Sequence, residues 1–131
     1  MLNAVIDTNV LVSGLLSENG NPARIINAFK ERQFNLIYNN EILAEYCDVL
    51  YRKKLGLEAK DIEILLDDIY RVGLSVIPSL SDEKFIDEDD KIFYDTAHTS
   101  GAILVTGNKK HFPVKSFILT PAEFLEVLFI K

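Results

Sequence analysis

The sequence predicts an α/β fold, a three-layer α/β/α sandwich with a central parallel sheet of about five strands. Two features of the 131-residue chain support this prediction. Short apolar segments alternate along the chain with longer segments in which apolar residues recur at helical spacing. Most of the short segments are continuously apolar, which is typical of parallel strands that helices cover on both faces. We expect a single domain spanning residues 1–131.

The first elements follow from periodicity and from turn residues. Residues 3–6 form an apolar run, and the segment 8–16 after it predicts a helix. Pro22 favours the first helical position of a second helix, predicted over 23–33. A second short strand is expected over 34–38.

The third helix is framed by residues that favour helix ends. Asn39 or Asn40 is suited to cap its first turn, and the helix is expected to run to about Lys54 and to end at Gly56. The remaining predicted elements are a helix over 60–72, a strand over 74–77, a polar loop over 78–88, a helix over 90–100, and strands over 102–106 and 116–119. Thr120 and Glu123 then form a capping box that begins a last helix.

The composition and net charge argue against several classes of protein. The net charge of −6 argues against a protein that holds nucleic acid on a broad basic face. The longest apolar runs are too short to span a bilayer, and no signal peptide is evident. The single cysteine, Cys47, permits no internal disulfide and is expected to be a small buried side chain. These features favour a folded protein of the cytoplasm with no membrane partner.

Asp7 is the most informative acidic residue, because it directly follows the first predicted strand. Open α/β sheets bind their ligands at the carboxyl ends of the strands. An unpaired carboxylate is unfavourable at such a buried place, so the position indicates a metal ion or a hydrogen-bonded network.

Three acids share the third predicted helix, and helical geometry separates them. At about 100° per residue, Glu45 lies about 40° outside the apolar arc, at the rim of the core. Glu41 and Asp48 lie further toward solvent. Glu45 is therefore the member of this group best placed to accompany Asp7.

A second acidic group, residues 87–90, precedes the next helix. Capping and compensation of the helix dipole explain most of this group, although four acids exceed what a cap needs. Asp90 borders the predicted buried arc, about 20° from Ala97. Asp95 is predicted to lie beyond the opposite edge of that arc, so we expect it to have no more than a supporting role.

Polar residues also follow the fourth predicted strand. Thr106, Gly107 and Asn108 occupy the same topological position as Asp7, although, taken alone, an ordinary turn at the end of a strand explains them better. Lys109 and Lys110 beside them are candidate phosphate contacts or part of a solvated loop. No motif for hydride transfer, nucleoside triphosphate binding or zinc chemistry is present.

Taken together, these residues resemble the PIN-domain ribonucleases. The resemblance rests on Asp7-Thr8-Asn9, on Glu45, on Asp90 seven residues before Ala97, and on Thr106-Gly107-Asn108, and it covers nearly the whole chain. It is closest to the toxin components of bacterial and archaeal toxin–antitoxin pairs.

The resemblance implies a catalytic site and a cofactor. Asp7, Glu45 and Asp90 would form the acidic triad that binds one or two Mg²⁺ or Mn²⁺ ions, and Asn108 would occupy a fourth position that is commonly aspartate. Oxygen ligands favour these cations over zinc. The residues expected to support the ligands are Thr8, Asn9, Ser13, Asp95 and Thr106. The residues expected to contact substrate phosphates are Lys91, Lys109 and Lys110.

The implied reaction is hydrolysis of RNA phosphodiester bonds, with an antitoxin protein and a homodimer as implied partners. A PIN-like module that binds nucleic acid or protein with little catalysis remains an alternative, which Asn108 favours because it lacks a charge. A phosphatase with Asp7 as nucleophile is a third interpretation. Asn9 stands against it, because it occupies the place of the second aspartate that such enzymes need.

Overall fold

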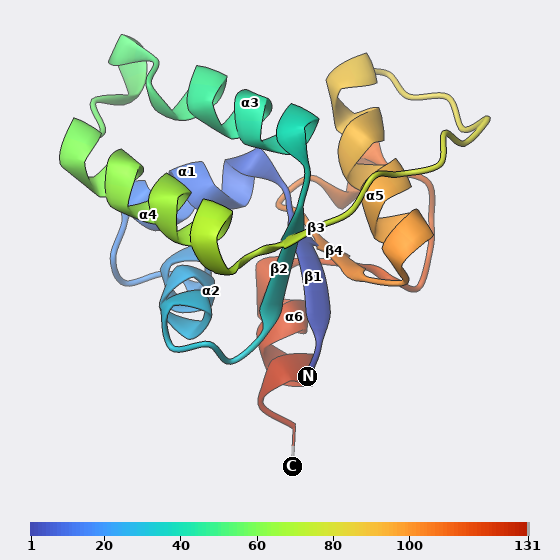
Figure 1. Ribbon diagram of the computed structural model, residues 1–131. Coiled ribbons are helices and arrows are strands. Elements are labelled where there is room, and N and C mark those ends of the chain that lie inside the picture. The colour runs from blue at the N-terminus through green and yellow to red at the C-terminus, as the bar shows by residue number, and fades with distance from the viewer. Residues whose placement is uncertain (131) are drawn as a thin grey trace.

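Five parallel strands form the central sheet in the computed structural model, which describes residues 1–130 (Figure 1). The strands stand in the order β3-β2-β1-β4-β5, and every neighbouring pair is parallel. Their bounds are β1 (Asn3–Ile6), β2 (Asn35–Tyr38), β3 (Leu74–Ser75), β4 (Ile103–Val105) and β5 (Ile118–Leu119). The predicted fold class is confirmed.

Helices cover both faces of this sheet and its carboxyl edge. The helices are α1 (Thr8–Leu16), α2 (Asn21–Lys30), α3 (Asn40–Leu50), α4 (Ala59–Val72), α5 (Lys91–Ser100) and α6 (Pro121–Leu128). Short 3₁₀ segments are η1 (Lys53–Leu55), η2 (Glu88–Asp90) and η3 (Lys109–His111). Helix α5 packs on β1, β2 and β4, whereas α3 contacts α1, α4 and α5 and crosses above the strand ends (Figure 1).

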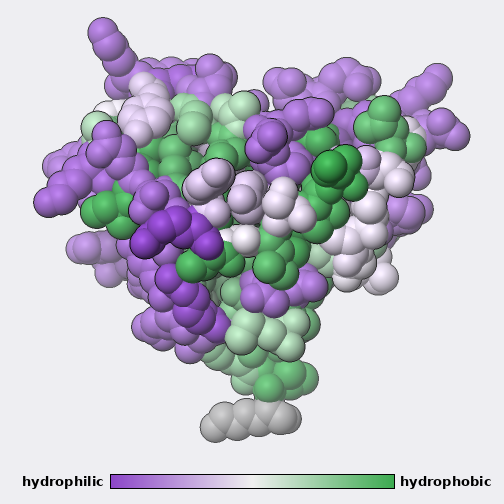
Figure 2. All heavy atoms as spheres, in the orientation of Figure 1, coloured by the Kyte–Doolittle hydropathy of each residue, from purple (hydrophilic) through white to green (hydrophobic). Residues whose placement is uncertain are grey.

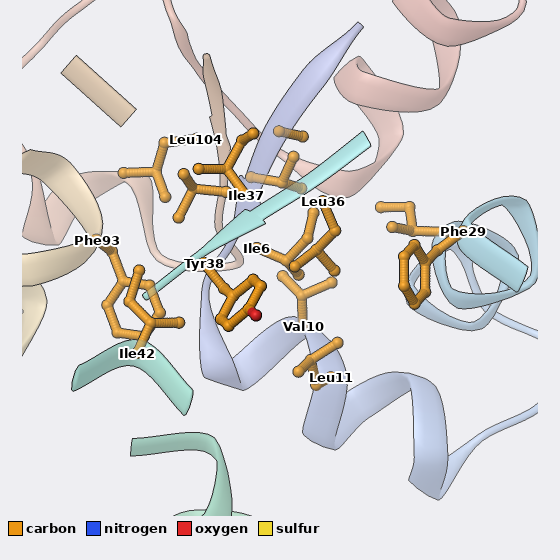
Figure 3. Close-up of a cluster of buried hydrophobic side chains, with 14 of the residues drawn as sticks. Ile6, Val10, Leu11, Phe29, Leu36, Ile37, Tyr38, Ile42, Phe93 and Leu104 are labelled. Carbon is orange, nitrogen blue, oxygen red and sulfur yellow. The ribbon is translucent and has the colours of Figure 1, made fainter. Parts of the chain in front are cut away.

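The core follows from the alternation of side chains along the strands. Ile6 and Leu36 face Leu11 of α1 and Phe29 of α2. On the other face, Val5 is paired in register with Leu104, and Ile37 with Leu74. Figure 3 shows Ile37 and Leu104 on the side of Phe93, and Ile6 and Leu36 on the side of Phe29. Both faces are buried, which explains why the strands are continuously apolar.

The order of the strands creates a switch point between β1 and β4. The chain runs from β1 outward to β2 and β3, and then returns to place β4 on the other side of β1. Connections therefore leave the carboxyl ends of β1 and β4 in opposite directions and open a crevice between them. Asp7 follows β1 and Thr106 follows β4, so both residues border this crevice.

Most predicted elements agree with the structure to within a few residues, and the largest difference is at the end of α3. The helix stops at Leu50 instead of near Lys54, and the chain continues as η1. Gly56 adopts a left-handed conformation with φ of 67°, so it ends the 3₁₀ segment and not the helix. The predicted capping box of α6 is confirmed, with Thr120 and Glu123 bonded reciprocally.

The prediction that Cys47 is buried is wrong, because its side chain is exposed. Helix α3 buries Ile42, Tyr46 and Leu50, which follow one another at intervals of four residues. Cys47 follows Tyr46 by one position, about 100° around the helix, and so lies to the side of this buried stripe.

Asn39 connects the elements that carry the acidic residues. Its side chain is buried, caps α3 by accepting from the Ile42 amide at 3.0 Å, and donates to Thr96 Oγ1 in α5 at 2.8 Å. It also donates to the carbonyl of Val76 at 3.1 Å, just beyond β3. One amide thus fixes α3 relative to α5.

We expect Asn39→Ala to lower the free energy of unfolding by about 2–3 kcal/mol, because it removes a helix cap and leaves buried polar groups without partners. Urea denaturation monitored by circular dichroism measures the change. Asn40→Ala, at an exposed neighbouring position, is the control and should change stability by less than about 0.5 kcal/mol. Equal effects of the two substitutions would contradict this role of Asn39.

The surface combines hydrophilic and hydrophobic regions. Figure 2 shows hydrophilic side chains over much of the periphery and hydrophobic ones reaching the surface toward the middle of this face. Leu74 of the edge strand β3 and Ile77 after it are among the large exposed apolar residues. Within residues 1–130, no helix combines the length and the apolarity needed to cross a membrane.

Candidate active site

An open pocket of about 420 Å³ lies at the carboxyl edge of the sheet. Asp7, Glu45, Asp90 and Asn108 all line it, although they come from four separate segments. Asp7 joins β1 to α1, Glu45 lies on α3, Asp90 ends η2, and Asn108 follows β4. The fold therefore brings together the four residues that were expected to form the catalytic site.

Asp7 is held by side chains from both strand ends. It is 6% exposed, and its Oδ2 accepts hydrogen bonds from Thr106 Oγ1 at 2.8 Å and from Asn9 Nδ2 at 3.3 Å. Asn9 Oδ1 in turn accepts from the Gly107 amide at 3.2 Å, and Thr106 Oγ1 accepts from the Asn108 amide at 3.0 Å. These bonds cross the switch point and fix the orientation of the carboxylate.

The other residues expected to support the ligands are placed differently. Thr8 is buried, but its hydroxyl has no hydrogen-bond partner among the described residues. Ser13 is exposed and lines the pocket beside Asn9 and Asn108.

Glu45 is positioned by its neighbour in the sequence. Tyr46 is fully buried, packs against Phe93 with ring centroids 6.1 Å apart, and donates its hydroxyl hydrogen to the Ile6 carbonyl. Since Ile6 precedes Asp7, this bond anchors α3 directly above the end of β1. Glu45 is half-buried, whereas Glu41 and Asp48 are exposed, as helical geometry predicts.

Asp90 has the feature of the pocket that points most clearly to a ligand-binding role. Its Oδ2 is buried and has no hydrogen-bond partner among residues 1–130, and His111 Nδ1 lies 3.7 Å from that atom. Asp87 has an ordinary capping role, because its Oδ1 accepts from the Asp89 amide at 2.9 Å. Asp87 thus has a capping role and also lines the pocket, whereas Asp90 lines the pocket and has a buried oxygen without a hydrogen-bond partner among the described residues.

Burial, followed by neighbouring acidic side chains, disfavours the charged form of each of the three carboxyl groups. Burial raises the pKa of Asp7, and the hydrogen bond from Thr106 opposes this change only in part. Burial also raises the pKa of Glu45. Burial, followed by the charge of Asp7, raises the pKa of Asp90 from 3.8 to about 6. The pocket therefore has an excess of negative charge that a cation would neutralise.

The donor set fits a hard divalent cation. Every donor in the set is a carboxylate or amide oxygen, and Asp90 has an unsatisfied buried oxygen. Within the described part of the chain, no three acidic, histidine or cysteine side chains converge closely enough to hold an ion by themselves. Mg²⁺ is commonly bound by one or two carboxylates, with water and substrate phosphate completing its shell.

The prediction that Asp95 lies outside the buried arc of α5 is wrong. Its side chain is 1% exposed, and Lys91 Nζ lies 2.7 Å from its Oδ2. The helical-face argument fails because the loop after β3 covers a second side of α5, where Phe85 packs on Tyr94 with ring centroids 5.5 Å apart. Asp95 is not among the residues that line the pocket.

The three lysines expected to contact phosphates lie outside this pocket. Lys91 is paired with Asp95, and Lys109 Nζ lies 3.1 Å from Glu123 Oε1. Lys109 and Lys110 line a separate hollow beside Phe112. Their role in binding substrate stays a prediction.

The pocket also contains basic residues that the sequence analysis did not select. Arg52 and Lys54 line it, as does His111. Arg52-Lys53-Lys54 is the longest run of basic residues in the chain, which was the available signal.

A carboxylate pocket at the switch point of an open parallel sheet defines an α/β protein that binds a cation or polar ligand at the carboxyl edge of its sheet. Comparison with known families gives the particular class. The chain belongs to the PIN-domain family, which matches residues 3–110. PIN domains are in general nucleases that act on nucleic acids and use divalent metal ions.

A protein from an archaeon is similar to this chain over most of its length. An uncharacterized protein of Methanocaldococcus jannaschii is 31% identical over 141 aligned positions, which cover 95% of this chain and 90% of that protein. The likeness therefore extends over most of the α/β unit.

The raised pKa of Asp90 predicts how stability depends on pH without metal. Between about pH 4 and pH 6 the folded state binds the Asp90 proton more tightly than the unfolded state, so stability falls as pH rises through this window. Asp90→Asn should reduce this dependence, to which Asp7 and Glu45 also contribute, and should raise the free energy of unfolding at pH 7 by about 1 kcal/mol, because solvent near the half-buried Asp90 screens the effect. Urea denaturation in EDTA at pH 4.5 and pH 7 measures both effects.

Asp82→Asn, in the exposed part of the loop after β3, is the control and should leave the pH dependence unchanged. An Asp90→Asn variant that is less stable than the wild type at pH 7 would contradict the prediction.

Proposed function

We propose that this protein is a divalent-metal-dependent endoribonuclease that hydrolyses RNA phosphodiester bonds. The observation that carries the proposal is the unsatisfied buried oxygen of Asp90, in a pocket that it shares with Asp7 and Glu45 at the switch point. Membership of the PIN-domain family supports the same reaction class.

The residues of the pocket have distinct roles in this proposal. Asp7 holds the principal Mg²⁺ or Mn²⁺ ion, with Thr106 and Asn9 fixing its orientation. Asp90 and Glu45 complete the ligand set or orient the attacking water. A bound cation would stabilise charge on the reacting phosphate and lower the pKa of that water.

Asn108 limits the charge available for a second cation. Its amide oxygen can reach a cation directly or through water, but it carries no negative charge. Affinity for hard cations follows the charge of the ligands. We therefore expect one ion to bind more tightly than any second one.

The resemblance to toxin components extends the proposal. In that role the protein would cleave RNA in the cell until an antitoxin protein covered the pocket. Expression of the wild type in a bacterial host should then arrest growth, and expression of Asp7→Asn should not.

Cleavage of a labelled single-stranded RNA with Mn²⁺, Mg²⁺ or excess EDTA tests the reaction. We expect cleavage with either metal and none in EDTA. Full activity in EDTA would overturn the proposal. Absence of both cleavage and Mn²⁺ binding at millimolar metal, measured by isothermal titration, would instead favour a binding module without catalysis.

A further inference from the structure

The carboxylate pocket has a basic rim at its other end. Arg52 and Lys54 line the same pocket as Asp7 and Asp90. Figure 1 shows α3 crossing the carboxyl edge of the sheet and leading into the green segment that joins it to α4. The early end of α3 at Leu50 and the turn at Gly56 bring this basic segment back to the pocket.

Lys54 is available to bind an anion. Its side chain is exposed, and it forms no ion pair with any residue in the range 1–130. Within the described residues, Arg52 pairs only with Asp48, at 2.9 Å, and at least about half of each side chain is exposed. Such a surface pair is weak and exchanges readily for a stronger anion.

The pocket also has an apolar lining, which Val12 of α1, Val49 of α3 and Leu55 of η1 provide. Val49 follows Glu45 by one turn of α3 and precedes Arg52 in the chain, so it separates a carboxylate from the basic rim. An apolar wall with a cation at one end matches a nucleotide, whose sugar and base are less polar than its phosphate. Exposed bases are a feature of single strands.

The overall charge makes this local basic rim important. At −6 the protein repels a polyanion, and the carboxylates increase this repulsion near the pocket. Phosphates on either side of the scissile one therefore need cations that the chain itself provides. Among residues 1–130, Lys54 is the lysine that lines the pocket, whereas Lys91 and Lys109 lie outside it and are paired with acids.

We propose that Lys54, assisted by Arg52, binds a phosphate that flanks the scissile one in a single-stranded nucleic acid. Lys54 is thus a positioning residue, and the strand lies along the groove between α1 and α3. This inference rests on the proposed nuclease function, because it assumes that the scissile phosphate lies at the carboxylates.

A binding measurement tests the role of Lys54 independently of catalysis. In an Asp7→Asn background, where cleavage is expected to stop, Lys54→Ala should raise the Kd for a labelled single-stranded RNA by about fivefold. It should also reduce the slope of log Kd against log salt by about 0.7. Lys30→Ala, at the end of α2 on the opposite edge of the sheet, is the matched control and should change neither value.

Kinetics of the otherwise wild-type enzyme provide a second readout. Lys54→Ala should raise KM with a much smaller change in kcat, and Lys54→Arg should restore KM because it keeps the charge. Equal Kd values for Lys54→Ala and Lys30→Ala would overturn the inference even if the wild type cleaves RNA. Absence of RNA cleavage by the wild type would overturn the proposed function, while the comparison of Kd values would still decide the role of Lys54.

Discussion

Asp7→Asn should abolish RNA cleavage, lowering kcat on the order of a thousandfold, while leaving the fold intact. Asp7 lies at the centre of the proposed site, and an amide at this position carries no charge to hold a divalent cation. The same change should raise the thermal midpoint, since burial already disfavours the charged form of Asp7. A loss of activity combined with a gain of stability distinguishes a functional residue from a structural one.

Cleavage of labelled RNA and differential scanning calorimetry measure the two effects on the same samples. Asp82→Asn removes one negative charge from an exposed loop and should leave cleavage unchanged. Retention of more than a tenth of wild-type activity by Asp7→Asn would contradict the assigned role.

Lys91→Met should lower the free energy of unfolding by about 3–5 kcal/mol, because it leaves the buried carboxylate of Asp95 without its partner. The sequence favoured Lys91 as a phosphate contact, but a lysine that leaves Asp95 for a substrate would pay the same penalty. We therefore expect Lys91 mainly to stabilise α5, at the point where Asp90 precedes the helix.

Urea denaturation of Lys91→Met, Asp95→Asn and the double variant tests this assignment. We expect the double variant to recover much of the stability lost by Lys91→Met, because no buried charge then remains unpaired. Lys110→Met is the exposed control. A Lys91→Met variant with wild-type stability but weaker RNA binding would support the original phosphate-contact prediction instead.

Glu45 and Asp95 show where a prediction from helical periodicity succeeds and where it fails. Glu45 was correctly placed at the rim of the core, because α3 buries one simple stripe of side chains. The same reasoning misplaced Asp95, because α5 packs on the sheet with one face and beneath Phe85 and Phe117 with another. A single periodicity cannot describe a helix that is covered on two sides.

The ends of the helices also differ in how well the sequence predicts them. Thr120 and Glu123 specify the start of α6 through local bonds, which depend only on residues three positions apart. The end of α3 depends on how η1 returns toward the pocket, so the prediction from Gly56 was four residues too long.

The sequence by itself determined the fold class, the strand-end position of Asp7 and the choice of Glu45 and Asp90 as its companions. These features depend on local periodicity, turn residues and the general rule that ligands lie at the carboxyl ends of parallel strands. Only the tertiary structure decided which basic side chains share the pocket with the carboxylates. Lys91 forms an ion pair with the buried Asp95, whereas Lys54 lines the pocket although it lies in a distant segment of the chain. Side-chain pairing across separate elements depends on packing, which local sequence patterns do not encode.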